Sequence, residues 1–177
     1  MSGLERSVAN LCGAALAGIK PSSLAVCAEG ARGELDALAR AFSPKKIRIE
    51  QICVRDGRIT FLVFREEKLR SHLEKAENVS FLARYGYPVG SLEKSLFFLR
   101  LRLAGNAFPH EVGVFLGYPK EDIEGYIEDP NGFLFCGAWK VYCKAEEKKL
   151  LFEKYRRCRD CIMRRLLRGE SLAQIFR

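Results

Sequence analysis

Residues 46–66 read KIRIEQICVRDGRITFLVFRE, and this stretch decides the fold class. Apolar and polar residues alternate on both sides of Asp56-Gly57, which is typical of half-buried strands. Asp-Gly between two such runs is a strong signal for a two-residue hairpin turn. We therefore predict an antiparallel hairpin over residues 46–65 with one apolar face. That face consists of Ile47, Ile49, Cys53, Ile59, Phe61 and Val63.

The segments on either side of this hairpin are predicted to be mainly helical. Ser2 and Glu5 have the spacing of a capping box, so a first helix should begin there. A break near Asn10, with a second helix starting at Cys12, is the alternative. Further helices are expected over residues 34–42, 66–74, 77–85, 91–104 and 145–168, the last with a basic face. SLAVCA, residues 23–28, is a candidate short strand.

Residues 133–143 read FLFCGAWKVYC, and their aromatic and β-branched content favours a strand. The predicted fold class is therefore α+β. A small antiparallel sheet, made of the hairpin 46–65 and a strand near 133–142, would pack with several helices and the long C-terminal basic helix. A chain of 177 residues, 48% of them hydrophobic, fits a single domain over residues 1–177.

The net charge and the cysteine content indicate the cellular location of the protein better than they indicate a reaction or a ligand. A net charge of +8 favours anionic partners in general. The seven cysteines are odd in number and irregularly spaced, as expected of free thiols in a cytosol. No apolar run reaches the roughly 18 residues of a membrane span. Lys20 and Pro21 interrupt the first apolar region, which argues against a lipoprotein signal. We expect a cytoplasmic protein without a membrane partner.

The stretch FPHEVGVFLGYP, residues 108–119, contains one of the two histidines beside a glutamate. Pro109 suits the first position of a helix, and Gly117 suits its left-handed C-terminal cap. His110 and Glu111 would then lie in a first turn, where free backbone N–H groups favour a carboxylate and a neutral imidazole. The pair could serve as a base or a ligand clamp. It could equally be structural, since adjacent helical positions point about 100° apart.

Residues 108–129 also allow a helix-turn-helix interpretation. The second helix, KEDIEGYIED, has five acidic residues against one lysine. Phosphates would repel such a recognition helix. The residues therefore disfavour nucleic acid as a partner here but leave it open elsewhere in the chain.

Several segments resemble a bacterial family known as domain of unknown function 3793. They are residues 12–24, 108–129, 135–142, 152–158 and 169–176. The family is typical of anaerobic bacteria and has no established activity, so the resemblance implies a cytoplasmic location and little chemistry. Family members often have His-Cys-Ala-Pro where this chain has Leu11-Cys12-Gly13-Ala14. The missing imidazole weakens any mechanism based on a local His and Cys pair.

The first functional hypothesis is a binding or accessory protein. Its cleft would hold a small anionic ligand, a metal or a haem-like cofactor, and the sequence does not identify which. The candidate ligand-binding residues are Lys20, His110, Glu111, Tyr118, Trp139, Lys140 and Tyr142. Cys12 and His110 are the candidate metal ligands, because thiols and imidazoles bind borderline metals. Cys158 and Cys161 in mid-helix are better explained as packing residues.

Two alternative hypotheses belong to other functional classes, an enzyme and a docking protein. In a cysteine-dependent hydrolase or transferase, Cys12 would be the nucleophile and His110 the base, with Glu111 or Asp122 orienting the base. That requires Cys12 at a helix start, where its pKa is lowered. In the other, the basic face of the C-terminal helix would bind nucleic acid or protein, although such faces are usually just solvated. Whether the protein is an enzyme stays open.

Overall fold

The computed structural model describes residues 2–88, 90–105 and 107–176. These residues group into two compact units. The first unit contains residues 1–70 and 157–177, and the second unit contains residues 71–156. The single-domain organisation that the sequence favours stays a prediction.

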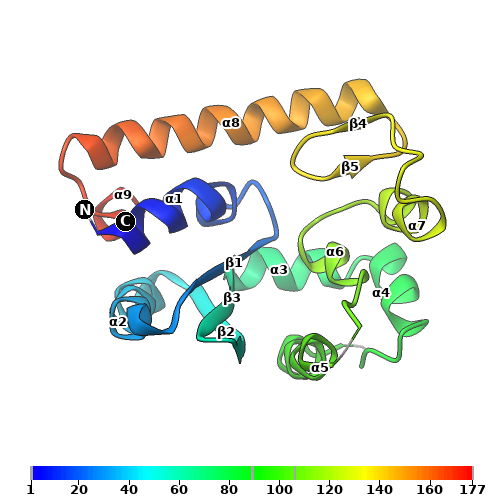
Figure 1. Ribbon diagram of the computed structural model, residues 1–177, viewed down its shortest axis with the longest axis horizontal. Coiled ribbons are helices and arrows are strands. Elements are labelled where there is room, and N and C mark those ends of the chain that lie inside the picture. Colours follow the sequence, from blue (N-terminus) through cyan, green and yellow to red (C-terminus); the bar gives the residue numbers. More distant parts are fainter. Residues whose placement is uncertain (1, 89, 106, 177) are drawn as a thin grey trace. The chain divides into compact units, whose positions relative to one another are not determined.

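The first unit is built around a three-stranded antiparallel sheet with the strand order β1-β3-β2 (Figure 1). The hairpin predicted from residues 46–65 is confirmed as β2 and β3. The elements with residues in this unit are α1 (Gly3–Leu16), β1 (Ser22–Ala28), the short 3-10 helix η1 (Glu29–Ala31), α2 (Arg32–Phe42), the 3-10 helix η2 (Ser43–Lys45), β2 (Ile47–Arg55), β3 (Arg58–Arg65), α3 (Glu66–Leu73), α8 (Ala145–Leu167) and α9 (Leu172–Ile175).

A bulge in β2 changes one expectation for the hairpin. Gln51 pairs with Phe61, and Cys53 pairs with Thr60, so Ile52 is the extra residue. Since side chains alternate along a strand, Cys53 lies on the face opposite Phe61. The assignment of Cys53 to the core face is therefore wrong, and Ile52 is buried instead.

The core of the first unit lies against one face of this sheet. Ile59, Phe61 and Val63 alternate along β3 and are all fully or almost fully buried. Helices α1, α2 and α9 and the C-terminal part of α8 supply the other side of the core, each through its apolar face. The residues contributed by these helices are Leu4, Val8, Ala9, Cys12, Leu16, Leu35, Leu38, Phe42, Ile162, Leu166 and Leu172.

The start of α1 has the predicted capping box. The backbone N–H of Glu5 donates to Ser2 Oγ at 3.1 Å, and the Glu5 carboxylate accepts from the backbone N–H of Ser2 at 3.4 Å. Glu5 Oε1 also accepts from the backbone N–H of Leu172, which ties α9 to this end of α1 (Figure 1). Helix α1 runs without interruption through Asn10 and Cys12. The alternative break near Asn10 is therefore wrong.

The second unit is mainly helical, with one small hairpin. Helices were expected over residues 77–85 and 91–104, and both are present. Its elements are α4 (Ala76–Ala83), α5 (Leu92–Ala104), α6 (Val112–Phe115), α7 (Lys120–Glu128), β4 (Phe135–Cys136) and β5 (Lys140–Val141). The C-terminal end of α3 and the N-terminal part of α8 also belong to this unit.

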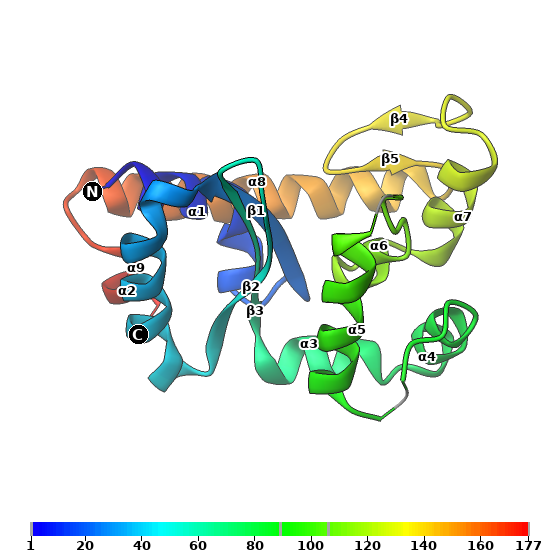
Figure 2. The same ribbon diagram turned by 60° about the horizontal axis from the view of Figure 1, so that its bottom comes forward.

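The α+β class is confirmed, but the segment near 133–142 differs from the prediction in detail. It forms two antiparallel strands, β4 and β5, in a sheet of their own (Figure 2). The chain reverses through residues 137–139, and the backbone N–H of Gly137 donates to the Trp139 carbonyl at 3.0 Å. The third strand of the larger sheet is β1, the SLAVCA segment. Among the described residues, no helix has the length and hydropathy that crossing a membrane requires.

The turn between β2 and β3 allows a direct test of the hairpin. Asp56 and Gly57 both have positive φ, 51° and 68°, as a type I′ turn requires. Replacing Gly57 with alanine should lower the free energy of unfolding by about 1 kcal/mol, because a Cβ disfavours this backbone region. Urea unfolding followed by circular dichroism measures this loss.

A matched control is Gly33→Ala in α2, where an added Cβ meets no other atom within 4 Å. There the substitution should be neutral or stabilising by up to about 1 kcal/mol, because alanine is the better helix former. Equal effects of the two substitutions would contradict the turn assignment.

Candidate functional site

The candidate site is a pocket of about 400 Å³ that lies within the second unit. Its position follows from α6, α7 and the β4–β5 hairpin, all of which contribute to the wall. The lining residues are Phe108, His110, Val112, Gly113, Leu116, Tyr118, Asp122, Ile123, Tyr126, Cys136, Gly137, Ala138, Trp139 and Lys140. Most are apolar or aromatic, with a few polar side chains among them. This composition is typical of small-molecule sites.

The floor of the pocket is formed by the short helix α6 and its cap. Val112 and Leu116 are buried, and Gly117 ends the helix with a positive φ of 76°, as the sequence predicts. The backbone N–H of Tyr118 then donates to the Gly113 carbonyl at 2.8 Å, which closes the cap. This cap directs the chain from α6 into Pro119 and α7. Tyr118 and α7 are thereby brought to the same pocket.

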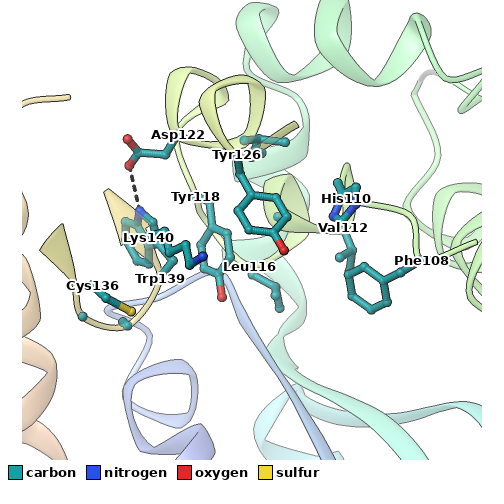
Figure 3. Close-up of a pocket in the computed structure, with 14 residues that line it drawn as sticks. Phe108, His110, Val112, Leu116, Tyr118, Asp122, Tyr126, Cys136, Trp139 and Lys140 are labelled. Atoms are coloured by element: carbon teal, nitrogen blue, oxygen red, sulfur yellow. Dashed lines mark hydrogen bonds between the residues drawn. The ribbon is translucent and has the colours of Figure 1, made fainter. Parts of the chain in front are cut away.

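Asp122 fastens the small hairpin to α7. It is 2% exposed, and its Oδ2 accepts a hydrogen bond from Trp139 Nε1 at 2.7 Å (Figure 3). Its Oδ1 accepts from the backbone N–H of Tyr142 at 2.8 Å and of Cys143 at 3.2 Å. Asp122 lies in the first turn of α7, where the helix dipole favours a carboxylate. Its role is therefore to position Trp139 and the hairpin.

Aromatic rings form much of the remaining wall. Tyr118 and Trp139 are stacked with ring centroids 4.6 Å apart, and burial raises the pKa of Tyr118, so its hydroxyl stays protonated at neutral pH. His110 makes an edge contact with Tyr126 at 5.1 Å and a tilted contact with Phe108 at 5.7 Å. Figure 3 shows His110 and Phe108 on one side of the pocket, with Trp139 on the other and Tyr126 between them.

Lys140 supplies the positive charge of the pocket. Its Nζ lies 5.4 Å from the ring centroid of Tyr126 and 4.8 Å from that of Phe133, both within the range of cation–π interactions. It also donates to the Pro130 carbonyl at 2.7 Å. Among the lining residues that the structure describes, Lys140 is the only lysine or arginine. A negatively charged ligand would therefore be drawn to this side.

The side chains of His110 and Glu111 lie in different places, although the two residues are adjacent in the chain. His110 is exposed at the pocket, whereas Glu111 is 1% exposed and lies outside the lining. Glu111 Oε1 accepts from Arg102 Nε at 2.7 Å and from the Tyr87 hydroxyl at 3.4 Å. Glu111 thus ties the segment before α6 to α5. A role of Glu111 in binding or in orienting His110 stays a prediction.

Four of the predicted ligand-binding residues line the pocket: His110, Tyr118, Trp139 and Lys140. Tyr142 is engaged beside it, since its hydroxyl donates to the Asp129 carbonyl at 2.8 Å and its ring packs on Gly125. Cys136 and Cys143 both lie in the segment 133–143 that was expected to be one strand, but the structure places them in different parts of the hairpin. Cys136 ends β4, and Cys143 follows β5.

Cys12 and Lys20 belong to the first unit. Cys12 is fully buried in the C-terminal half of α1, and burial raises the pKa of its thiol to about 12, although the charge of Lys20 opposes this. Burial also lowers the pKa of Lys20 to about 8. The thiol is not at a helix start, which was the condition for an activated nucleophile. A cavity shared by Cys12 and His110 stays a prediction.

No three His, Cys, Asp or Glu side chains come together as a candidate metal site within the part of the chain that the structure describes. The second histidine, His72, has a structural contact. Its Nε2 donates to the Val114 carbonyl at 2.9 Å, and burial lowers its pKa. His72 therefore carries its proton on Nε2 when neutral.

Sequence reasoning missed Phe108, Tyr126 and Cys136 as wall residues. Cys136 could have been found from Gly137-Ala138, because a glycine inside an apolar strand pattern is also a turn signal. With the turn recognised, Cys136 and Lys140 become directly opposed residues of a hairpin.

No curated protein and no solved structure matches the chain. A family model described as "Protein of unknown function (DUF3793)" matches residues 8–176, which is nearly the whole chain and includes every residue of the pocket. This agrees with the resemblance seen in the sequence. The chain therefore belongs to the DUF3793 family.

Proposed function

We propose that the protein binds a small, flat aromatic anion in the pocket of the second unit. The observation that carries this proposal is the combination of aromatic walls with Lys140 at one side. A volume of about 400 Å³ suits a ligand of one or two fused rings. Ring faces and edges offer offset or edge contacts to a flat ligand.

The charge of the ligand follows from the polar groups. The ammonium group of Lys140 can donate three hydrogen bonds, and a carboxylate is a matching acceptor. Asp122 is the one acidic side chain among the described lining residues, and it already accepts from Trp139 and from two backbone N–H groups. His110, on the other side of Tyr126, can donate a hydrogen bond to a polar group elsewhere on the ligand. A carboxylate near Lys140, with its ring against Tyr126, is the arrangement that we infer.

The alternatives have less support. Lys149 and Arg156 on the exposed side of α8 pair with Glu146 and Glu153 of the same helix, as a solvated face would. Nucleic-acid or protein docking through α8 stays a prediction without a specific contact behind it. Catalysis by Cys12 needs an ionised thiol, and the raised pKa of Cys12 opposes that.

Titration with naphthoate tests the proposal. Trp139 is the only tryptophan, so its indole N–H gives a single signal in a proton–nitrogen correlation spectrum. We expect this signal to shift saturably with a Kd of about 0.1–1 mM, a range typical of small unoptimised ligands. Lys140→Met should weaken binding about tenfold, equivalent to about 1.4 kcal/mol.

Two controls separate charge from shape. Naphthamide, which lacks the charge, should bind the parent protein about tenfold more weakly than naphthoate. Lys120→Met, at an exposed lysine of α7 outside the lining, should leave naphthoate binding unchanged. An indole signal that does not respond to naphthoate, or responds equally in the Lys140→Met variant, would refute the proposal.

A further inference from the structure

Cys136 stands out among the cysteines, because it is exposed and also lines the pocket. It lies directly opposite Lys140 in the β4–β5 register. Directly opposed residues of an antiparallel pair have Cβ atoms about 4.5–5.5 Å apart on the same face. The side chains of Cys136 and Lys140 therefore leave the hairpin on the same face, and both line the pocket. Figure 3 shows the Cys136 sulfur on the same side as Trp139 and Lys140.

We propose that Cys136 is a covalent exchange site for an aromatic disulfide that carries a negative charge. This rests on the proposed function, because the same aromatic walls and the same Lys140 would hold the ligand. It names the ligand class more closely: an aromatic acid with a sulfur–sulfur bond beside its ring. The product is a mixed disulfide between Cys136 and one half of the ligand.

The exchange is balanced without any further reagent. The Cys136 thiol loses its proton to water, and the thiolate attacks one sulfur of the bound disulfide. The new bond joins the Cys136 sulfur to that sulfur, and the old sulfur–sulfur bond breaks. Its electron pair leaves with the second aromatic thiolate. The cysteine is oxidised and the bound disulfide is reduced.

The expected rate gain comes from proximity. A ligand held against Tyr126 and Lys140 keeps its reactive sulfur near the thiol, which turns a bimolecular reaction into a local one. Because of the pocket walls and the charge of Lys140, Cys136 should react faster with aromatic disulfides that carry a negative charge than with other disulfides. A neutral disulfide would gain from the walls but not from the charge.

The chain contains a matched internal control in Cys161. This residue is the other exposed cysteine, and it lies on α8 with Arg157, Arg164 and Arg165 at helical spacing. Like Cys136, it has basic residues close to it in the chain, but it does not line the pocket. A difference in rate between the two thiols reports the pocket rather than charge alone.

The experiment uses dithiobis(nitrobenzoate), an aromatic disulfide with a carboxylate on each ring, on the full chain and its Cys136→Ser and Cys161→Ser variants. Release of the coloured thiolate gives the rate, and peptide mass spectrometry identifies the labelled cysteine. We expect Cys136 to react at least about tenfold faster than Cys161. The rate at Cys136 should saturate with reagent and fall when naphthoate is added.

Lys140→Met should slow labelling of Cys136 by this anion about tenfold, while the rate with neutral dithiodipyridine stays the same. Equal rates at Cys136 and Cys161, or saturable labelling that naphthoate does not slow, would overturn the inference. If naphthoate shifts the Trp139 signal but Cys136 shows no selectivity, only the exchange site fails. If naphthoate does not bind, the proposed function fails and the inference falls with it.

Discussion

Replacing Asp122 with alanine is expected to lower the free energy of unfolding by about 3 kcal/mol and to release the β4–β5 hairpin from α7. The substitution leaves the indole N–H of Trp139 and the backbone N–H groups of Tyr142 and Cys143 without their acceptor. A buried donor that loses its partner costs about 1–3 kcal/mol, and those that water can reach cost less. Urea unfolding measures the loss.

The Asp122→Ala substitution should also change the spectrum near Trp139. Since Trp139 Nε1 donates to Asp122 at 2.7 Å, the indole signal should shift in the Asp122→Ala variant even without ligand. Naphthoate binding should weaken in parallel, because Trp139 and Lys140 would no longer be held in place. Glu121→Ala is the matched control, since Glu121 is exposed in the same turn of α7. Its effect should be below about 0.5 kcal/mol. Equal stabilities of the two variants would contradict the positioning role of Asp122.

Local signals explain why the hairpin and most helices could be predicted. The Asp56-Gly57 turn and the alternating pattern around it depend on residues close in the chain, and so does the capping box at Ser2. The pairing of one strand with another, in contrast, depends on residues that are far apart in the chain. Strand β1 pairs with β3, so that Ala25 lies opposite Phe61, and nothing local in SLAVCA specifies that partner. The sequence therefore predicted the strand but not its place in the sheet.

The error near 133–142 has a similar cause. Each strand of this hairpin has only two residues, and the link from Asp122 to Trp139 joins residues 17 apart in the chain. A two-stranded hairpin of this size is marginal by itself. Its existence depends on a tertiary contact, so its apolar and aromatic residues resemble a single strand when only the pattern is available.

The sequence predicted the types of side chain in the site better than it predicted which individual residues line the pocket. His110, Tyr118, Trp139 and Lys140 line the pocket, and each had been singled out for the chemistry of its side chain. Glu111 is turned toward Arg102, a direction that the sequence cannot supply. Cys136 was missed because the turn at Gly137-Ala138, which sets it opposite Lys140, was read as part of one strand.

Cys12 is expected to be about a thousandfold less reactive toward iodoacetamide at pH 8 than a free cysteine. Burial raises the pKa of its thiol from 9.0 to about 12. Each pKa unit removes about a factor of ten from the thiolate fraction at pH 8, and the thiolate is the nucleophile. Peptide mass spectrometry after timed labelling measures the rate at Cys12 and, in the same sample, at exposed Cys161.

The pH profile gives an independent check on the cause. The rate for a free thiol levels off once pH exceeds its pKa near 9, since nearly all of it is then ionised. A group with a raised pKa keeps gaining thiolate above that point, so the Cys12 rate in the folded chain should still rise about tenfold per pH unit between 9 and 10. Unfolding in urea should restore the ordinary profile. A folded-state rate equal to that of a free thiol would mean that the Cys12 thiol is accessible to solvent and has an ordinary pKa, and the assignment of Cys12 to the buried core would then be wrong.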